Sequence, residues 1–441
     1  MMADSGLAIG VDERLNRAVQ DAMGVFASAN PESKRRYQAA CQVMPGGNTR
    51  SVLYFPPFPL CLVRGEGCNL WDADGHRYTD LLAEFTAGIY GHSDPVIRAA
   101  IDAALDGGVN LSGHNHLEAE LARVICERFP SIDQLRFANS GTEANLIALG
   151  AATAFTKRRK IVVFEGGYHG GVLAFPPGGA GLNVPHDFIV APYNDAEAAT
   201  RLIRQHEREL AAVLVEPMLG AGGCIPADRE FLATLRAETS RCGAVLIFDE
   251  VMTSRLSPGG RQALLDIVPD MTTLGKYIGG SMAFGAFGGR ADIMLQFDPR
   301  RPDALFHAGT FNNSIVTMAA GVAGMTKVLT PERCIDLNTR GDRMRDGLNA
   351  LFARHHAPLK VTGLGSVMSI HAMGAATTAA AIKDLVFFEL IARGFYLARR
   401  GLIALSLPVT DADATAMTKA MDDVLRTQRD VLCAPEHTEA T

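Results

Sequence analysis

The start of the chain repeats apolar side chains at helical spacing. Four of them stand at positions i, i+4, i+8 and i+11, on one face of a helix: Leu15, Val19, Met23 and Phe26. Asn30-Pro31-Glu32 then predicts an N-cap with proline in the first turn of a second helix, which runs to Val43. The chain is therefore expected to begin with two amphipathic helices.

Shorter apolar runs follow over residues 60–82. The segment LCLVRGEGCNLWDADGHRYTDLL separates them with Gly-Glu-Gly and Asp-Ala-Asp-Gly turns. This pattern predicts three strands joined as a β-meander. A helix should then begin at Asp94-Pro95 and end at Gly107-Gly108, because proline is favoured in the first turn and glycine after the last one.

From residue 134 the pattern becomes strand, loop and helix in turn. Five short apolar runs are expected to be strands: Leu135–Ala138, Ile161–Phe164, Phe188–Ala191, Ala212–Val215 and Val245–Phe248. Helical stretches lie between them, such as Glu143–Phe155, Ala196–Glu209 and Glu230–Ser240. Apolar strands that alternate with helices predict a parallel sheet covered on both faces.

The pattern changes again near residue 325. The expected elements are a helix near 331–354, a strand at Val361–Thr362, strands in GLGSVMSIHA and GLIALSLPV, and a closing helix over 411–429. We predict an α/β fold in which residues 83–325 form a large, mainly parallel-sheet domain. Residues 1–82 and 326–441 should together form a smaller α+β domain.

Composition narrows the possible function classes. Lys and Arg number 42 against 48 Asp and Glu, a net charge of −6, so no basic field is present that would gather nucleic-acid phosphates. The eight cysteines form no C-x-x-C pair, which favours reduced thiols over disulfides or a metal site. The N-terminal sequence lacks a secretory signal, and the longest near-apolar run, Leu146 to Phe155, is too short to span a membrane. We expect a cytoplasmic protein that binds neither nucleic acid nor membrane.

Lys276 is the lysine with the most unusual surroundings. The chain has only eight lysines, and this one follows Leu274-Gly275 and precedes Tyr277-Ile278-Gly279-Gly280. A buried lysine with small neighbours has a lowered pKa and room for an adduct, as Schiff-base chemistry requires. A structural role for this lysine is the alternative.

Asp249 follows the apolar run Val245–Phe248, at the carboxyl end of a predicted strand. Ligands of open α/β sheets bind at that edge. A helix cap or a Mg²⁺-binding acid of an ATPase would have the same local sequence. The ATPase is disfavoured because the only Gly-Lys pair, Gly275-Lys276, is not part of a G-x-x-x-x-G-K-[ST] loop.

Two further segments follow predicted strands. Ser140-Gly141-Thr142 opens a helix, where free N–H groups and hydroxyls bind anions, although the same residues would also make a good N-cap. Tyr168 lies in a glycine-rich loop, EGGYHGG, where its ring could cover a flat cofactor or pack within the loop. No G-x-G-x-x-G or G-x-S-x-G motif is present, which disfavours a dinucleotide enzyme and a serine hydrolase.

These four signals together specify pyridoxal phosphate. Its phosphate needs a helix N-terminus, its ring a stacking face, its pyridine nitrogen a carboxylate and its aldehyde an amine. Six motifs then carry a family resemblance: ANSGTEAN, FEGGYHGG, VEPM, IFDEVMT, TLGKYIGG and HAGTFNN. In order and approximate spacing they resemble the class III aminotransferases of fold type I, over roughly residues 25–425.

Two branches of the family are similar to this chain. MPGGNTRS and TTLGKYIGG are similar to glutamate-1-semialdehyde 2,1-aminomutase, whereas PPFPL, GTFNNS and RRGLIALSLPVTDAD resemble the transaminases of β-phenylalanine and related β-amino acids. The aminomutase usually has Ser-Gly-Asn-Pro where this chain has Phe311-Asn312-Asn313-Ser314, and it lacks the arginine pair at 399–400. The aminomutase, or another ω-aminotransferase, is the alternative to the β-transaminase. Intact Lys276 and Asp249 argue against a non-catalytic binding protein.

The resemblance implies pyridoxal 5'-phosphate as cofactor and a homodimer with the cofactor at the subunit boundary. It implies that Lys276 forms the Schiff base and that Asp249 contacts the ring nitrogen. The remaining cofactor contacts that it implies are Ser140, Gly141 and Thr142 for the phosphate with Thr310 of the partner subunit, and Tyr168, Val251, Met252 and Glu216 around the ring. His169 belongs to a motif but receives no catalytic role.

The reaction that the resemblance implies is (S)-selective transamination of an aromatic β-amino acid, with 2-oxoglutarate or pyruvate as acceptor and ping-pong kinetics. The carboxylates of these amino and keto acids are assigned to Arg50 and Arg400. Arg399 is the neighbouring alternative to Arg400. A surface ion pair is the simpler interpretation of each arginine when the family is set aside. The sequence leaves open the preferred acceptor, the side chain of the donor and any assembly beyond a dimer.

Overall fold

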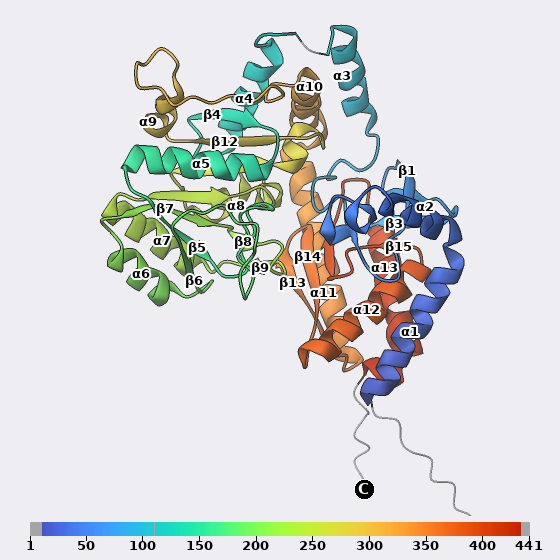
Figure 1. Cartoon of the computed structure of the whole chain (residues 1–441). Coiled ribbons are helices and arrows are strands. Elements are labelled where there is room, and N and C mark those ends of the chain that lie inside the picture. The colour runs from blue at the N-terminus through green and yellow to red at the C-terminus, as the bar shows by residue number, and fades with distance from the viewer. Residues whose placement is uncertain (1–10, 110, 434–441) are drawn as a thin grey trace, which may run out of the picture. The chain divides into compact units, whose positions relative to one another are not determined.

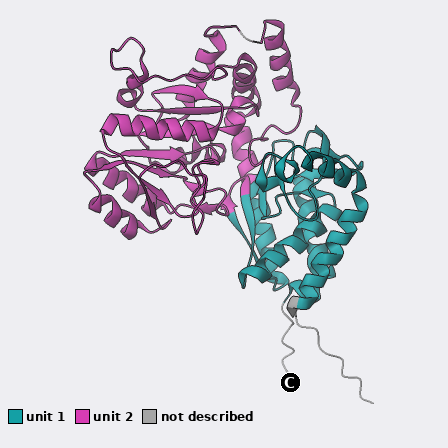
Figure 2. Cartoon of the chain, in the orientation of Figure 1, with its two compact units in different colours: residues 1–83, 340–362, 368–441 teal, residues 84–339, 363–367 magenta. Residues whose placement is uncertain are grey.

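The computed structural model describes residues 11–109 and 111–433, which divide into two compact units (Figure 2). Unit 1 takes its described residues from the two chain ends, up to Ala83 and from Arg340 onward. Unit 2 comprises the described residues of Glu84–Thr339 together with Gly363–Val367. No helix among the described residues is both long and apolar enough to cross a membrane.

A seven-stranded sheet forms the centre of unit 2. Its strands, from edge to edge, are β4 (Gln134–Ala138), β12 (Gly285–Gly289), β11 (Met271–Gly275), β10 (Val245–Asp249), β7 (Leu210–Val215), β5 (Lys160–Phe164) and β6 (Phe188–Ala191). All are parallel except β12, which is antiparallel to both of its neighbours. The expected parallel sheet is confirmed, and each of the five expected strands lies within one of these strands.

Helices cover both faces of this sheet (Figure 1). Successive strand residues alternate between the two faces: Val163 and Leu214 pack with α5 (Gly141–Thr156), whereas Val162 and Val213 pack with α6 (Ala196–Gln205) and α7 (Arg229–Cys242). The other helices of unit 2 are α3 (Pro95–Asp106), α4 (His116–Arg128), α8 (Gly260–Leu265), α9 (Ala291–Met294) and α10 (Ile315–Ala323). Burial on both faces explains why the strands are continuous apolar runs.

Two strands of this sheet, β11 and β12, were not among the expected apolar runs. β12 has the sequence GAFGG, which lacks the apolar signal of a buried strand. Its glycines are required by close approach, because a Cβ on Gly285 would lie 2.1 Å from the carbonyl oxygen of Ser140. A strand of this kind is specified by its neighbours and not by its own hydrophobicity.

Unit 1 contains the predicted meander and terminal helices. β1 (Leu62–Glu66), β2 (Asn69–Asp72) and β3 (Arg77–Asp80) pair in order and continue into β15 (Phe395–Tyr396). A second sheet has the order β13 (Leu359–Leu364), β14 (Val367–Ala372) and β16 (Leu402–Ala404). The helices are α1 (Val11–Ala29), α2 (Pro31–Cys41), α12 (Ala376–Ala392), α13 (Asp411–Thr427), α14 (Arg429–Leu432) and α11 (Pro331–Arg354), which begins in unit 2.

The expected stripe on α1 is confirmed, since Leu15, Val19 and Phe26 are buried. The ring centroid of Phe26 lies 5.4 Å from that of Phe388 on α12. Asn30 occupies the expected N-cap position of α2, with Pro31 in the first turn, but its side chain caps no N–H of α2; its amide donates instead to the carbonyl oxygen of Phe26 at 2.8 Å. Asn30 therefore closes the preceding helix, because α1 ends only one residue earlier.

Candidate cofactor and active site

The candidate residues of unit 2 lie at the carboxyl ends of its strands or directly after them. Ser140 follows β4, Tyr168 follows β5, Glu216 follows β7, Asp249 ends β10 and Lys276 follows β11. Because parallel strands end at the same edge of a sheet, this topology gathers residues that are far apart in the sequence. Thr310, by contrast, is exposed and lies on the segment between α9 and α10.

The N-terminus of α5 has the form of an anion-binding site. Ser140 is the N-cap, and its hydroxyl accepts a hydrogen bond from the N–H of Glu143 at 3.1 Å. The N–H groups of Gly141 and Thr142, in the first turn, have no partner within the helix. The N-cap interpretation of Ser140 is confirmed, and a capped helix start still presents N–H groups to an anion.

Glycines let neighbouring chains approach this helix start closely. A Cβ on Gly141 would lie 2.8 Å from Val251, and one on Gly170 would lie 2.1 Å from the hydroxyl oxygen of Thr142. Gly170 also has φ +127°, which disfavours any L side chain. The loop after β5 and the loop after β10 are therefore packed directly against the residues that open α5.

Asp249 is buried, and three donors hold its carboxylate. Oδ2 accepts from Asn145 Nδ2 at 2.8 Å and pairs with His169 Nδ1 at 2.7 Å, while Oδ1 accepts the N–H of Val251 at 3.0 Å. The side chains of Asp249 and His169 are only 4% and 1% exposed. A carboxylate with so little water around it is a strong partner for a cationic ring nitrogen.

Glu216 is a second buried carboxyl group and holds the Tyr168 loop. Oε1 accepts the N–H of Tyr168 at 2.8 Å, and Oε2 accepts the N–H of Gly220 at 2.9 Å. Burial raises the pKa of Glu216 to about 7; His169 opposes that shift and Asp249 adds to it. Tyr168 itself is 48% exposed, so its ring is open to stack on a ligand. Met252 is buried, close to Gly220.

Lys276 is half-buried, not fully buried as expected, and it has an unusual backbone. Its φ is +57°, in the left-handed region that lysine rarely adopts. It begins a short 3₁₀ helix, Lys276–Gly279, whose next residues Tyr277 and Ile278 are buried. Such backbone strain is typical of functional sites.

Three residues of the Asp249 network had no predicted role. Asn145 and Thr273 were not singled out, and His169 was noted only as part of a motif. The one available signal was a polar side chain at an otherwise apolar position, Asn145 on the sheet side of α5 and Thr273 within β11. A sequence pattern does not show that these side chains meet at Asp249.

The two arginines assigned to carboxylates lie in unit 1. Arg50 is half-buried and precedes a short 3₁₀ helix, Ser51–Leu53. Arg400 is exposed and precedes β16. Arg399 forms a bidentate pair with Asp384, in which Nε and Nη2 donate to the two carboxylate oxygens at 2.6 Å and 2.7 Å.

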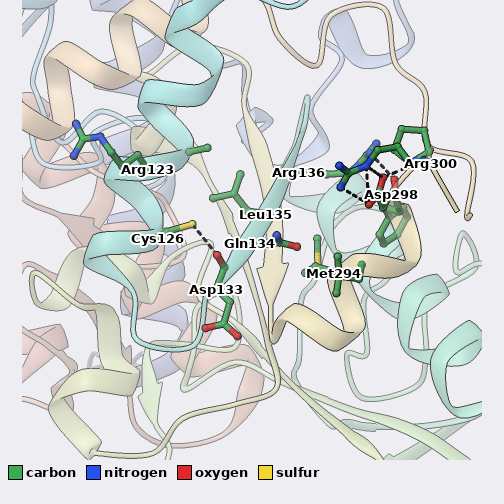
Figure 3. Close-up of a pocket in the computed structure, with 13 residues that line it drawn as sticks. Arg123, Cys126, Asp133, Gln134, Leu135, Arg136, Met294, Asp298 and Arg300 are labelled. Atoms are coloured by element: carbon green, nitrogen blue, oxygen red, sulfur yellow. Dashed lines mark hydrogen bonds and ion pairs between the residues drawn. The ribbon is translucent and has the colours of Figure 1, made fainter.

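Two hollows mark the surface of unit 2. The first, about 410 Å³, lies between α4, β4 and the segment after α9; Figure 3 shows Arg300 paired with Asp298 at its rim and the Cys126 thiol donating to the carbonyl oxygen of Asp133. None of the candidate residues lines it. The second, about 430 Å³, is lined by Thr310 with Val109, Leu111 and Phe311 among others.

The residues present fit pyridoxal phosphate. A helix start is available for the phosphate, an exposed aromatic ring for stacking, a buried carboxylate for the ring nitrogen and a strained lysine for the aldehyde. Fold and site together define a fold-type I enzyme dependent on pyridoxal 5'-phosphate. The sequence model of class III aminotransferases matches residues 54–425, and the chain belongs to that family.

Individual relatives of known activity agree with the assignment to the class III aminotransferases. A beta-phenylalanine transaminase of Variovorax paradoxus is 55% identical over 407 residues, which are 90% of this chain and 94% of that relative. A crystal structure of a beta-phenylalanine aminotransferase from the same organism has a TM-score of 0.93 at 53% identity and covers 95% of this chain and 99% of that one.

More distant relatives are also similar. A glutamate-1-semialdehyde 2,1-aminomutase of Desulforudis audaxviator is 37% identical over 407 residues, 86% of this chain and 94% of the relative. A transaminase solved with PLP bound is 32% identical, with a TM-score of 0.85, and covers 91% of this chain and 99% of that one.

Proposed function

We propose that this chain moves the amino group of an aromatic β-amino acid, such as (S)-β-phenylalanine, to 2-oxoglutarate or pyruvate. The observation that carries the proposal is the 55% identity, over nearly the whole chain, to a relative named for that donor. The aminomutase relative is less similar, at 37%. It is the second candidate because it is named for a different use of the same cofactor chemistry.

When bound, pyridoxal phosphate supplies an aldehyde for amines and a ring that accepts electrons from the adjacent carbon. In the proposal, the amine of Lys276 would hold the cofactor at its aldehyde. The same amine, when free, would move a proton at the substrate carbon that bears nitrogen. Asp249 keeps a proton on the ring nitrogen, because a buried carboxylate stabilises the adjacent positive charge.

The remaining cofactor contacts are proposed from the same geometry. Ser140, Gly141 and Thr142 bind the phosphate through the start of α5, and the exposed ring of Tyr168 stacks on the cofactor. Val251 and Met252, which follow Asp249, line the ring together with Glu216. The contacts of Val251 with Gly141 and of Met252 with Gly220 support this arrangement.

Arg50 and Arg400 are proposed to bind substrate carboxylates. A β-amino acid places its carboxylate one carbon further from nitrogen than an α-amino acid, so one anchor at a single distance would not serve both the donor and an α-keto acid. Arg400 is taken as the second anchor because it is exposed directly before β16, whereas Arg399 makes a bidentate pair with Asp384.

The enzyme is proposed to be a homodimer in which Thr310 of the partner subunit completes the phosphate site. The segment that carries Thr310 supports this, because its Phe306 and Phe311 are 93% and 61% exposed and Phe311 lines the second hollow together with Thr310. Exposed aromatic side chains of this size are typical of an interface. A second copy of the chain is the proposed occupant.

We further propose a cytoplasmic location, which the free thiols of all eight cysteines support.

The test of the function is the requirement for an acceptor. With β-phenylalanine as donor, purified holoenzyme should form the keto product continuously only when 2-oxoglutarate or pyruvate is added. Conversion of glutamate-1-semialdehyde without a keto acid, and no turnover of β-phenylalanine with either acceptor, would favour the aminomutase instead.

A further inference from the structure

We propose that Asn145, held in one orientation by Thr273, is a positioning residue that turns Oδ1 of Asp249 toward the cofactor ring. The inference rests on the role proposed above for Asp249 and extends it to two residues that do not touch the substrate. It assigns the two carboxylate oxygens different tasks: Oδ2 is anchored in the protein, and Oδ1 faces the ring nitrogen.

Counting acceptor positions shows which oxygen is available. An ionised carboxylate accepts about four hydrogen bonds, about two at each oxygen. Both positions of Oδ2 are occupied by Asn145 and His169, whereas Oδ1 accepts only the N–H of Val251 from the described residues. One acceptor position of Oδ1 therefore remains for the N–H of the pyridine ring.

The carboxylate would not hold this orientation by itself. Rotation about the last bond of an aspartate side chain has a broad, two-fold profile, so the two oxygens exchange easily unless donors distinguish them. His169 is fixed in turn, since its carbonyl oxygen accepts from the same Asn145 amide at 3.1 Å. Asn145 thus holds both Asp249 and the residue that pairs with Asp249.

Thr273 fixes which way the Asn145 amide faces. Its hydroxyl donates to Asn145 Oδ1 at 2.7 Å, while Nδ2 faces two acceptors, Asp249 Oδ2 and the His169 carbonyl. A flipped amide would point its oxygen at both of those acceptors. Thr273 is in the right place because it lies opposite Asp249 in the parallel ladder of β10 and β11, and both side chains are buried.

The test uses Thr273→Val, which keeps the shape and β-branching of threonine but removes the hydroxyl, with Thr273→Ser as the matched variant that retains it. The first readout is the pH midpoint of the absorbance of the lysine-bound cofactor. Thr273→Val should shift that midpoint, and Thr273→Ser should restore it to the wild-type value. The second readout is kinetic: kcat for β-phenylalanine should fall about fivefold in Thr273→Val, the effect of one lost hydrogen bond, with KM within about twofold.

Asn145→Ala provides a second route to the same question. It should shift the midpoint in the same direction as Thr273→Val and by more, because it removes a donor to Asp249 itself. An unchanged midpoint and kcat in Thr273→Val, or in a folded Asn145→Ala variant, would overturn the proposal. Asp249→Asn distinguishes failure of this proposal from failure of the proposed role of Asp249. If Asp249→Asn turns over like the wild type, the assignment of Asp249 fails. If Asp249→Asn loses about tenfold or more in kcat while Thr273→Val is unchanged, only the role of Asn145 is contradicted.

Discussion

At the scale of single residues, the two buried carboxyl groups of the site have contrasting surroundings. Among the described residues, Asp249 accepts from two side chains and one backbone N–H, while Glu216 accepts only from backbone N–H groups. Environments that separate two neighbouring acids in this way commonly separate their roles. Asp249 is placed to pair with a cationic ring nitrogen, and Glu216 holds the Tyr168 loop through the two N–H groups that it accepts.

The raised pKa of Glu216 predicts a pH-dependent stability of the apoprotein. The folded-state pKa of about 7 is above the ordinary value of 4.5, so the folded state binds more protons. The contribution of Glu216 to the free energy of unfolding is therefore fully present below pH about 4.5 and is lost as the pH rises through about 7. Urea unfolding between pH 5 and 8 should show this fall in wild type and a flatter profile in Glu216→Gln. The exposed Glu230→Gln variant serves as control and should follow the wild type; a Glu216→Gln profile as steep as wild type would contradict the assignment.

The two arginine anchors predict different kinetic defects. A charge-assisted pair with a carboxylate in a partly dry site contributes about 1.5–3 kcal/mol. Arg50→Ala should therefore raise KM for the β-amino acid roughly tenfold to a hundredfold. Arg400→Ala should raise KM for 2-oxoglutarate more than for pyruvate, which has no second carboxylate. Steady-state kinetics with each acceptor measures this, and equal losses for the two acceptors in Arg400→Ala would refute the division of roles.

At the scale of elements, the sequence predicted what periodicity and turn residues determine. The helix that begins after Asp94 and the five apolar strands are all present. Ends were less well predicted: α6 stops at Gln205, four residues before the expected end, and only Leu402–Ala404 of the segment 401–409 forms a strand. Glycine-rich β12 and the Asn145–Asp249 contact were not predictable, since both depend on neighbours from distant parts of the chain.

The packing of the β5 loop on α5 predicts different effects for two adjacent glycines. A Cβ on Gly170 would overlap Thr142 and require φ +127°, whereas one on Gly171 would meet nothing within 4 Å. Gly170→Ala should displace the start of α5 and weaken cofactor binding about tenfold or more, since incompatible Gly→Ala changes cost more than about 1 kcal/mol. Gly171→Ala should bind the cofactor like wild type. Cofactor titration of the two apoproteins decides, and equal affinities would contradict the packing argument.

At the scale of the whole molecule, unit 2 exposes apolar side chains around its second hollow. Val109, Leu111 and Phe311 line the second hollow together with Thr310, and all three apolar side chains are exposed. Apolar surface of this kind is stabilised when a partner covers it.

The domain boundaries expected at residues 82 and 325 stay predictions.

The proposed dimer predicts that a charge in this hollow separates the subunits. Phe311→Arg should shift the protein from dimer to monomer in analytical ultracentrifugation, because a guanidinium would be buried without a partner. Val190→Arg, at another exposed apolar position on the edge strand β6, is the control and should stay dimeric. A dimeric Phe311→Arg variant would place the interface elsewhere.

The central claim is that this enzyme takes the amino group of an aromatic β-amino acid onto its own cofactor. Purified holoenzyme mixed with racemic β-phenylalanine, without any keto acid, tests it most directly by absorbance. The account predicts a single turnover in which the absorbance of the lysine-bound cofactor is replaced by that of the pyridoxamine form, using only the (S) enantiomer, with no change in Lys276→Ala. A spectrum of the wild-type holoenzyme that stays unchanged at saturating β-phenylalanine would contradict the account.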